Sequence, residues 1–279
     1  MNLFLKTMAR ARSSACMAQH WRAAQTPCSG NRFSSRSLFP CLRTSVVKLT
    51  VSVSVLVVAF FSGIVCAETG AEAWLRYAPL AEADRARYAN LPASIAVFPA
   101  GDSQLLHSAQ QELIRGSKGM LGRTLRGAGG EVKEPSFVLG TIVSLGAAEP
   151  EFKPPSELHA DSFWLKTGKI RGFDCIVIAG ATDRGVLYGV FALLSRVARG
   201  ESISALDEVQ QPYAPIRWVD QWDNLDGRIE RGYAGRSIFF DGGRVRDDLS
   251  RARDYARLLA SVGINGCAIN NVNADPRVL

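Results

Sequence analysis

The stretch that most constrains the fold is residues 215–240, PIRWVDQWDNLDGRIERGYAGRSIFF. It opens with a β-branched and aromatic run at 216–220, which is typical of a half-buried strand. That run passes directly into a polar cluster at 221–224. A helical segment follows, and a second strand-like run at 266–269 also ends in polar residues. We call the polar residues at the end of each strand a polar tip. A strand with a polar tip, then a helix, then a second strand with a polar tip is the pattern with which a parallel α/β barrel begins.

The two polar tips are the first candidates for a binding site, because such barrels carry their sites at the C-terminal ends of the strands. Amides and a carboxylate can pair with several hydroxyl groups, and an indole can lie flat against the apolar face of a sugar ring. Packing of the indole inside the protein is an equally good interpretation. The expected contacts to a hydroxylated ligand are Trp222, Asp223, Asn224, Asn270 and Asn271.

Two arginines lie in the loop after the first polar tip, Arg231 and Arg236. Their planar guanidinium groups could each donate two hydrogen bonds to an acidic ligand group. Isolated arginines in loops are usually solvated, so we give them less weight than the polar tips.

Residues 68–211 predict an α+β domain with the element order β-α-β-β-β-α and its helices on one face of the sheet. The expected strands are 94–98, 137–145, 163–167 and 175–179, the last two forming a hairpin. The expected helices are 103–122 and one that begins at Thr182 or Asp183 and is closed by Gly200. The polar segment 201–211 is expected to be a connection, and 74–77 an anchor against the folded body.

The positive charge of the chain lies in its first part. The whole sequence has 33 Lys and Arg against 26 Asp and Glu, and residues 1–67 contain eight of the basic residues and no acid. The remainder is therefore close to neutral, and the formal charge of +7 gives no reason to expect a nucleic-acid partner.

Residues 1–67 are expected to be a leader. An uncharged apolar run, Leu49 to Ala67, follows Lys48 and ends in small side chains. This is typical of a secretory signal with a long basic n-region, cleaved after Ala67. The run is also long enough for a membrane anchor, and both interpretations place the following residues outside the cell. A transit peptide, or a start codon placed too early, would also account for the acid-free first 45 residues.

Ready-made catalytic or metal-binding motifs are absent from the sequence. His107 and His159 have no metal-ligand partner at a recognised spacing, and the glycines at 127–130 lack the strand-to-helix context of a phosphate-binding loop. Cys175 and Cys267 lie in apolar runs, where free thiols usually pack as small hydrophobes. We expect neither a metal nor a cofactor.

The amino-acid sequences of several segments resemble those of a known family. The run Gly180 to Gly189, GATDRGVLYG, is similar to the helix-opening motif of the accessory domain before the barrel in hexosaminidases and related hydrolases. Residues 216–240, with 255–266 and 270–274, resemble the α-glucuronidases of glycoside hydrolase family 67. The resemblance implies a hexosaminidase domain-2-like α+β accessory domain at 68–211, and at 212–279 the first two strands of a (β/α)8 TIM barrel, which is truncated in this chain.

The resemblance also implies an activity, the removal of α-1,2-linked glucuronic acid or its 4-O-methyl ether from xylo-oligosaccharides. Such enzymes resemble inverting glycosidases with two carboxyl groups. Their catalytic carboxylates come from later strands, so none is expected before Leu279 and this fragment alone is expected to be inactive. Asp161 stands where the accessory domain would offer an acid to the pocket.

Two other interpretations remain open. The chain could be a non-enzymatic remnant in which only the α+β domain folds and acts as a binding module. It could also belong to a hexosaminidase-type enzyme that has only the accessory domain in common with family 67. The amino-acid sequence of residues 221–235 argues against this.

Overall fold

The computed structural model describes residues 70–99, 103–150, 152–154 and 158–269. The expected leader and the two expected site residues Asn270 and Asn271 lie outside the described residues. The described residues belong to one compact unit. None of their helices is both long and apolar enough to cross a membrane.

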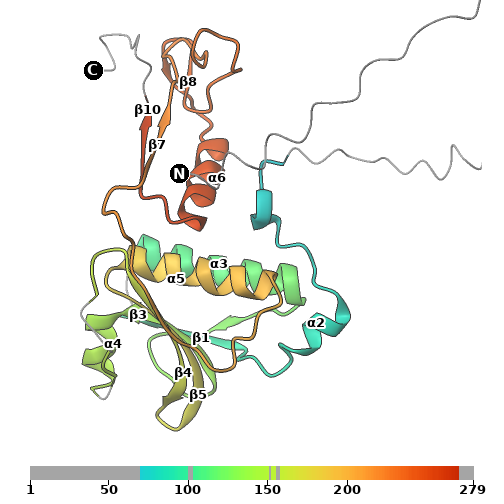
Figure 1. Cartoon of the computed structure of the whole chain (residues 1–279), viewed down its shortest axis with the longest axis vertical. Coiled ribbons are helices and arrows are strands. Elements are labelled where there is room, and N and C mark those ends of the chain that lie inside the picture. The colour runs from blue at the N-terminus through green and yellow to red at the C-terminus, as the bar shows by residue number, and fades with distance from the viewer. Residues whose placement is uncertain (1–69, 100–102, 151, 155–157, 270–279) are drawn as a thin grey trace, which may run out of the picture. The chain divides into compact units, whose positions relative to one another are not determined.

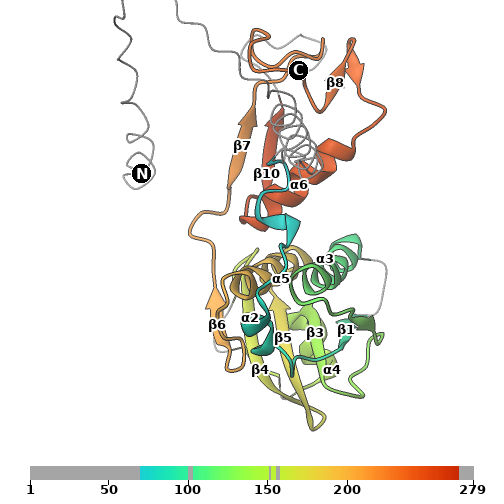
Figure 2. The ribbon, with the colours of Figure 1, turned by 90° about the vertical axis from the view of Figure 1, so that its right-hand side faces the viewer.

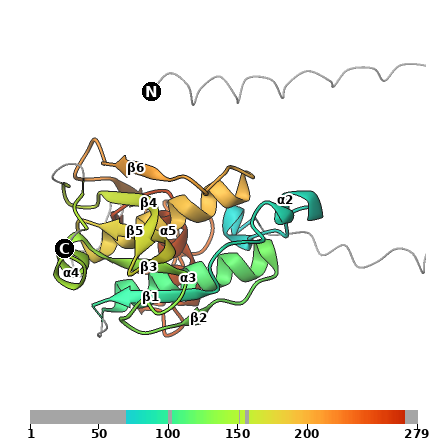
Figure 3. The same cartoon turned by 90° about the horizontal axis from the view of Figure 1, so that it is seen from below.

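A six-stranded mixed sheet forms the centre of the α+β part (Figures 1 and 3). Strands β2, β1, β3 and β5 pair in parallel, and β4 is antiparallel to both of its neighbours, β5 and β6. In spatial order the strands are β2 (Arg126–Gly127), β1 (Ser94–Phe98), β3 (Ser136–Thr141), β5 (Phe173–Gly180), β4 (Phe163–Ile170) and β6 (Asp207–Gln210).

Two long helices cover one face of this sheet, α3 (Gln104–Leu121) and α5 (Asp183–Ala198). Ser103 and Thr182 are their N-caps, and each side chain accepts a hydrogen bond from the first turn. The apolar side of α5 is buried along its whole length, and Gly200 has the left-handed φ of +70° that ends the helix. The buried side of α3 is less regular, because Leu105 is exposed and Glu112 is buried.

The expectation of a strand over 137–145 is wrong in its second half. The strand β3 ends at Thr141, and a short helix, α4 (Ile142–Ala148), begins there. Thr141 caps that helix by accepting from the Ser144 amide at 3.1 Å. Ile142, Leu145 and Ala148 recur at helical spacing and pack on the sheet face opposite α3 and α5. Helices therefore lie on both faces of the sheet, not on one as expected.

The expected hairpin is confirmed, with longer strands than predicted. β4 and β5 pair from Phe163 and Gly180 down to Ile170 and Phe173. Arg171 and Gly172 form the two-residue turn with φ of +51° and +85°, the backbone signs of the tight turn that matches strand twist. The expectation of a plain connection over 201–211 is wrong, because β6 lies within it as a polar edge strand on β4.

The first described residues pack as the expected anchor. The short 3-10 helix η1 (Ala73–Arg76) buries Leu75, and Tyr77 after it is also buried in the core shared with α3 and α5. A further short helix, α2 (Glu82–Ala86), leads into β1.

The expected strand–helix–strand unit is present after residue 212 (Figure 2). Strand β7 (Trp218–Gln221) pairs in parallel with β10 (Gly266–Ile269), and α6 (Ser250–Ser261) lies between them in the chain. A small antiparallel pair, β8 (Phe240–Asp241) and β9 (Arg244–Val245), belongs to the long loop after β7.

Candidate functional site

The loop at the carboxyl end of β7 is held by hydrogen bonds between its own backbone groups. The Glu230 amide donates to the Trp222 carbonyl at 2.7 Å, and an isolated β-bridge joins Asp223 to Ile229. The Asn224 amide donates to the Arg228 carbonyl at 2.8 Å. The chain therefore doubles back on itself directly after the strand, and residues 228–230 lie beside the polar tip.

Trp222 is the accessible member of the expected site. Its side chain is 39% exposed, and its indole Nε1 donates to Asp220 Oδ2 at 2.9 Å. This hydrogen bond fixes the ring edge while part of the indole remains open. The arrangement can hold the apolar face of a sugar ring.

Asn224 has a different position from the one expected of a ligand contact. Its side-chain nitrogen donates to the Arg228 carbonyl at 3.1 Å and to the Glu230 carbonyl at 2.6 Å. The amide thus closes the loop. Its contribution to the site is to hold residues 228–230 in place.

Asp223 is the unusual residue of the tip. It is only 3% exposed, and among the described residues neither carboxylate oxygen has a hydrogen-bond partner. Buried carboxylates are normally paired, so this one is available to a donor. Tyr255 of α6 and Cys267 of β10 are close enough for the charge of Asp223 to raise both of their pKa values, although burial is the larger cause for each.

Sequence reasoning missed Tyr255 and Phe239, which shape this region, and did not single out Gln221 within the polar cluster. Gln221, the last residue of β7, donates through Nε2 to the Tyr255 hydroxyl, and Phe239 stacks edge-on against the Tyr255 ring. Tyr255 thus supports the strand end from the helix side. No motif marks it; only its place in an expected helix between two expected strands pointed to such a contact.

Of the two loop arginines, Arg236 pairs with Asp241 at 2.8 Å. Arg231 is exposed, and the described part of the chain offers its side chain no recorded hydrogen bond or ion pair. Arg231 therefore remains the one of the two that is open to an acidic ligand group.

Asp161 does not lie with Trp222, Asp223 and Asn224, the other expected site residues that the structure describes. Its carboxylate contacts the residues that precede β7 and β10, Arg217 and Asn265, whereas Trp222 follows the other end of β7. Arg217 and Trp222 flank the four-residue strand and are five residue steps apart, which is about 16 Å at 3.3 Å per residue. This geometry gives no support to the expected reach of Asp161 into the pocket.

A second ionic cluster, also missed, lies between the helices. Glu112 of α3 is 4% exposed and accepts from the Tyr77 hydroxyl at 2.6 Å. Arg257 of α6 donates to both oxygens of Glu112, at 2.8 and 2.6 Å, and lies over the Tyr77 ring. Burial, and then the charge of Glu112, raises the pKa of Tyr77 well above its usual range. The cluster attaches α6 to the α+β part.

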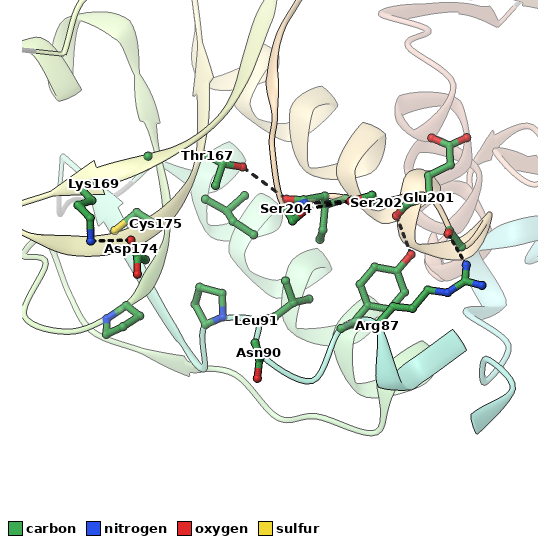
Figure 4. A pocket seen from close by; sticks show the side chains of 17 residues that line it. Arg87, Asn90, Leu91, Thr167, Lys169, Asp174, Cys175, Glu201, Ser202 and Ser204 are labelled. Atoms are coloured by element: carbon green, nitrogen blue, oxygen red, sulfur yellow. Dashed lines mark hydrogen bonds and ion pairs between the residues drawn. The ribbon is translucent and has the colours of Figure 1, made fainter. Parts of the chain in front are cut away.

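A hollow of about 850 Å³ lies elsewhere, where Arg87–Pro92, the β4–β5 hairpin and residues 200–204 meet (Figure 4). Its polar groups mostly pair with one another: the Tyr88 hydroxyl donates to the Glu201 carbonyl at 2.7 Å, and Lys169 pairs with Asp174. None of the expected site residues lines it. We do not assign it a ligand.

In the described ranges, no group of three or more His, Cys, Asp and Glu side chains could hold a metal ion. Cys175 and Cys267 are both free thiols.

Two profiles of one family match consecutive parts of the chain. The glycosyl hydrolase family 67 N-terminus matches residues 73–193, and the glycosyl hydrolase family 67 middle domain matches residues 196–279. Together they cover both the α+β part and the β7–α6–β10 unit.

Two curated proteins that are similar to this chain are named as alpha-glucuronidases. The chain is 42% identical over 232 residues to the probable alpha-glucuronidase A of Aspergillus terreus, covering 81% of this chain and 26% of that protein. It is 43% identical over 226 residues to the alpha-glucuronidase of Hypocrea jecorina, covering 77% and 26%. The chain thus spans about a quarter of the length of the curated relatives it matches.

Among solved structures, a family GH115 4-O-methyl-alpha-glucuronidase with specificity for decorated arabinogalactans is similar at a TM-score of 0.45 and 15% identity. The similarity covers 64% of this chain and 25% of that one. This likeness is distant.

Proposed function

Because the chain belongs to glycoside hydrolase family 67, we propose that it is the N-terminal part of a longer α-glucuronidase. The substrate proposed for the whole enzyme is a xylo-oligosaccharide that carries α-1,2-linked glucuronic acid or its 4-O-methyl ether. The observation that carries the proposal is that the two family matches follow each other along the chain, over residues 73–193 and 196–279, together with relatives named alpha-glucuronidase.

The fold is proposed in finer terms as well. The six-stranded sheet with α3 and α5 would be a hexosaminidase domain-2-like accessory domain. The unit β7–α6–β10 would be the first turn of a (β/α)8 barrel, since parallel strands joined by a helix are the repeating unit of that fold. The parallel register of β7 and β10 supports this proposal.

The mechanism proposed for the whole enzyme is inversion. One carboxylic acid protonates the leaving oxygen, while a carboxylate about 6.5–9.5 Å away activates a water on the opposite face of the sugar. We assign neither role to a residue of this chain. Its own contribution is to binding: Trp222 offers an indole face, and Asp223 and Arg231 offer an acceptor and a cation.

The test is an assay of the whole enzyme on aldouronic oligosaccharides, with the anomer of the released acid followed by proton NMR. Inversion of an α-linkage should release the β-anomer first. Release of the α-anomer would overturn the inverting mechanism, and no release of uronic acid would overturn the function.

Trp222→Ala should raise KM roughly tenfold in the same assay, because it removes an aromatic contact worth about 1 kcal/mol beyond its buried area. Tyr213→Ala is the matched control, since this aromatic side chain is fully exposed before β7. A similar KM for both variants would exclude Trp222 from the binding site.

Secretion is a separate proposal, carried by the basic n-region and the apolar run Leu49 to Ala67. Sequencing the N-terminus of the protein recovered from culture medium should find Glu68 first. A protein that keeps the apolar run and sediments with membranes would instead be anchored, facing outward.

A further inference from the structure

Asp161 is a buried carboxylate in a tight turn just before β4. Its side chain is 3% exposed, and its backbone has a left-handed φ of +68°. Aspartate tolerates this conformation better than most residues, but it is still uncommon outside glycine. The turn is also held by a hydrogen bond from the Ser162 amide to the His159 carbonyl at 3.0 Å.

Three side chains from three parts of the chain donate to this carboxylate. Arg184, in the first turn of α5, donates through Nε to Oδ1 at 2.6 Å. Arg217, the residue before β7, donates to Oδ2 at 3.0 Å. Asn265, the residue before β10, donates to Oδ2 at 3.0 Å. One carboxylate therefore connects the α+β part to the starts of both parallel strands.

Arg217 and Asn265 also bind each other. The Arg217 amide donates to Asn265 Oδ1 at 2.9 Å, and the Asn265 amide donates to the Arg217 carbonyl at 2.9 Å. These bonds extend the pairing of β7 and β10 by one residue at its amino end, and this extension is the part that Asp161 contacts.

Tyr188 of α5 makes two further contacts with the residues that precede β7 and β10. Its hydroxyl donates to the Ile264 carbonyl at 3.1 Å, and the Arg217 guanidinium lies 5.8 Å from its ring centre. The starts of both strands are thus in contact with α5 by two independent routes.

We propose that Asp161 is a positioning residue that sets the register and placement of β7 and β10, and through β7 the placement of Trp222 and Asp223. Each strand has only four residues, so few ladder bonds oppose a slip, and a slip by one residue would turn every side chain to the other face. That this placement serves glucuronoside binding rests on the proposed function; the positioning itself does not.

Hydrogen exchange of the 279-residue chain tests the proposal, because it reads each strand separately and needs no substrate. In Asp161→Ala, amides of 217–221 and 264–269 should exchange roughly tenfold faster or more, since hydrogen bonds to a buried charge are lost. Amides of β1, β3 and β5 should keep their protection. Asp161→Asn retains one acceptor oxygen and should lie in between.

Asp174→Ala is the matched control, because Asp174 is an exposed aspartate whose ion pair with Lys169 lies in the β4–β5 hairpin. It should leave both strands unchanged. If Asp161→Ala fails to fold, Arg217→Lys provides the second variant: it keeps the charge, loses the fork, and should loosen the same two strands to a smaller extent.

Unchanged exchange in β7 and β10, or an equal loss of protection in all strands, would overturn the proposal. The first result would mean that the strands hold themselves, and the second that Asp161 only stabilises the whole fold. Neither result would bear on whether the longer protein is a glucuronidase, which the uronic acid assay decides.

Discussion

Glu112 is a buried acid on the apolar side of a helix, and its partners show why it is there. Tyr77 and Arg257 satisfy both of its oxygens from the two ends of the described chain. Removing one member of a buried ion pair leaves the other without compensation, which usually costs more than the pair contributes.

Glu112→Gln should therefore lower the free energy of unfolding of the 279-residue chain by about 3 kcal/mol. The reason is that Arg257, whose side chain is only 18% exposed, keeps its charge when the carboxylate is removed. Urea titration followed by circular dichroism measures this. Asp174→Asn, in an exposed ion pair, should have no measurable effect. Equal midpoints for the two variants would mean that the Glu112 cluster contributes nothing to folding.

The carboxyl of Asp161 gives a prediction about pH. Burial opposes its ionisation, but hydrogen bonds from Arg184, Asn265 and Arg217 outweigh burial and hold its pKa below the ordinary 3.8. A carboxyl whose pKa is lower in the folded state stabilises the fold above its unfolded pKa, and that contribution is lost as pH falls through the folded value.

The difference in unfolding free energy between the unmodified chain and Asp161→Asn should therefore be constant from pH 7 to about 5 and should shrink below about pH 4. Urea titrations at pH 7, 5 and 3 measure it. A difference that grows on acidification would have the wrong sign and would show that the pKa is raised.

At the scale of elements, the run GATDRGVLYG is explained by the close approach of β5 to α5. A Cβ on Gly180 would lie 2.4 Å from the Val186 nitrogen, and one on Gly185 would lie 2.3 Å from the Ser162 carbonyl oxygen. Both obstacles are backbone atoms and cannot rotate away. The glycines of the motif are therefore required by the packing of a strand against a helix and its neighbouring turn.

Gly185→Ala should destabilise the fold by about 3 kcal/mol, at the upper end of what overpacking a core costs. Gly168→Ala, in β4, is the matched control, since a Cβ there meets nothing within 4 Å. Thermal unfolding compares the two. A Gly185→Ala chain as stable as the control would mean that the turn at Ser162 can move aside freely.

Elements whose ends are defined by local chemistry could be predicted from the sequence. Thr182 caps α5 and Gly200 ends it because neighbouring residues decide both. Helix α4 was missed because Ile142 and Val143 are β-branched and continue the pattern of a strand, while the cap at Thr141 and the sheet face that receives Leu145 decide for a helix. Strand β6 was missed because its residues are polar except for Val209, and only the open edge of β4 orders them.

At the scale of the whole molecule, the β7–α6–β10 unit depends on the α+β part. In the described residues, the buried apolar side chains all come from Leu206 or earlier, and α6 buries none of its own. The hydrophobic effect that stabilises a domain is therefore supplied by the α+β part. The unit is held by the two clusters around Glu112 and Asp161 and by Leu258 and Ala260 of α6, which are partly buried against the core of the α+β part.

Residues 212–279 should consequently be unfolded when expressed alone, and in the double variant Glu112→Gln, Asp161→Ala a protease should remove this region and leave the α+β part intact. Limited proteolysis with mass spectrometry detects both outcomes. A protease-resistant 212–279 fragment would contradict the prediction.

The sequence by itself determined the order of the main elements, the ends of the long helices to within about one residue, the hairpin, the parallel strand–helix–strand unit and the polar tip at Trp222. These features depend on residues close together in the chain, whose spacing and side-chain chemistry are visible in one dimension.

Only the tertiary structure decided what the buried acids do. Glu112 and Arg257 are 145 residues apart, and Asp161 and Asn265 are 104 apart. An acid in an apolar stripe or in a loop has many potential partners in the sequence. Burial selects among them, because a charge taken out of water must be paired where the fold places it.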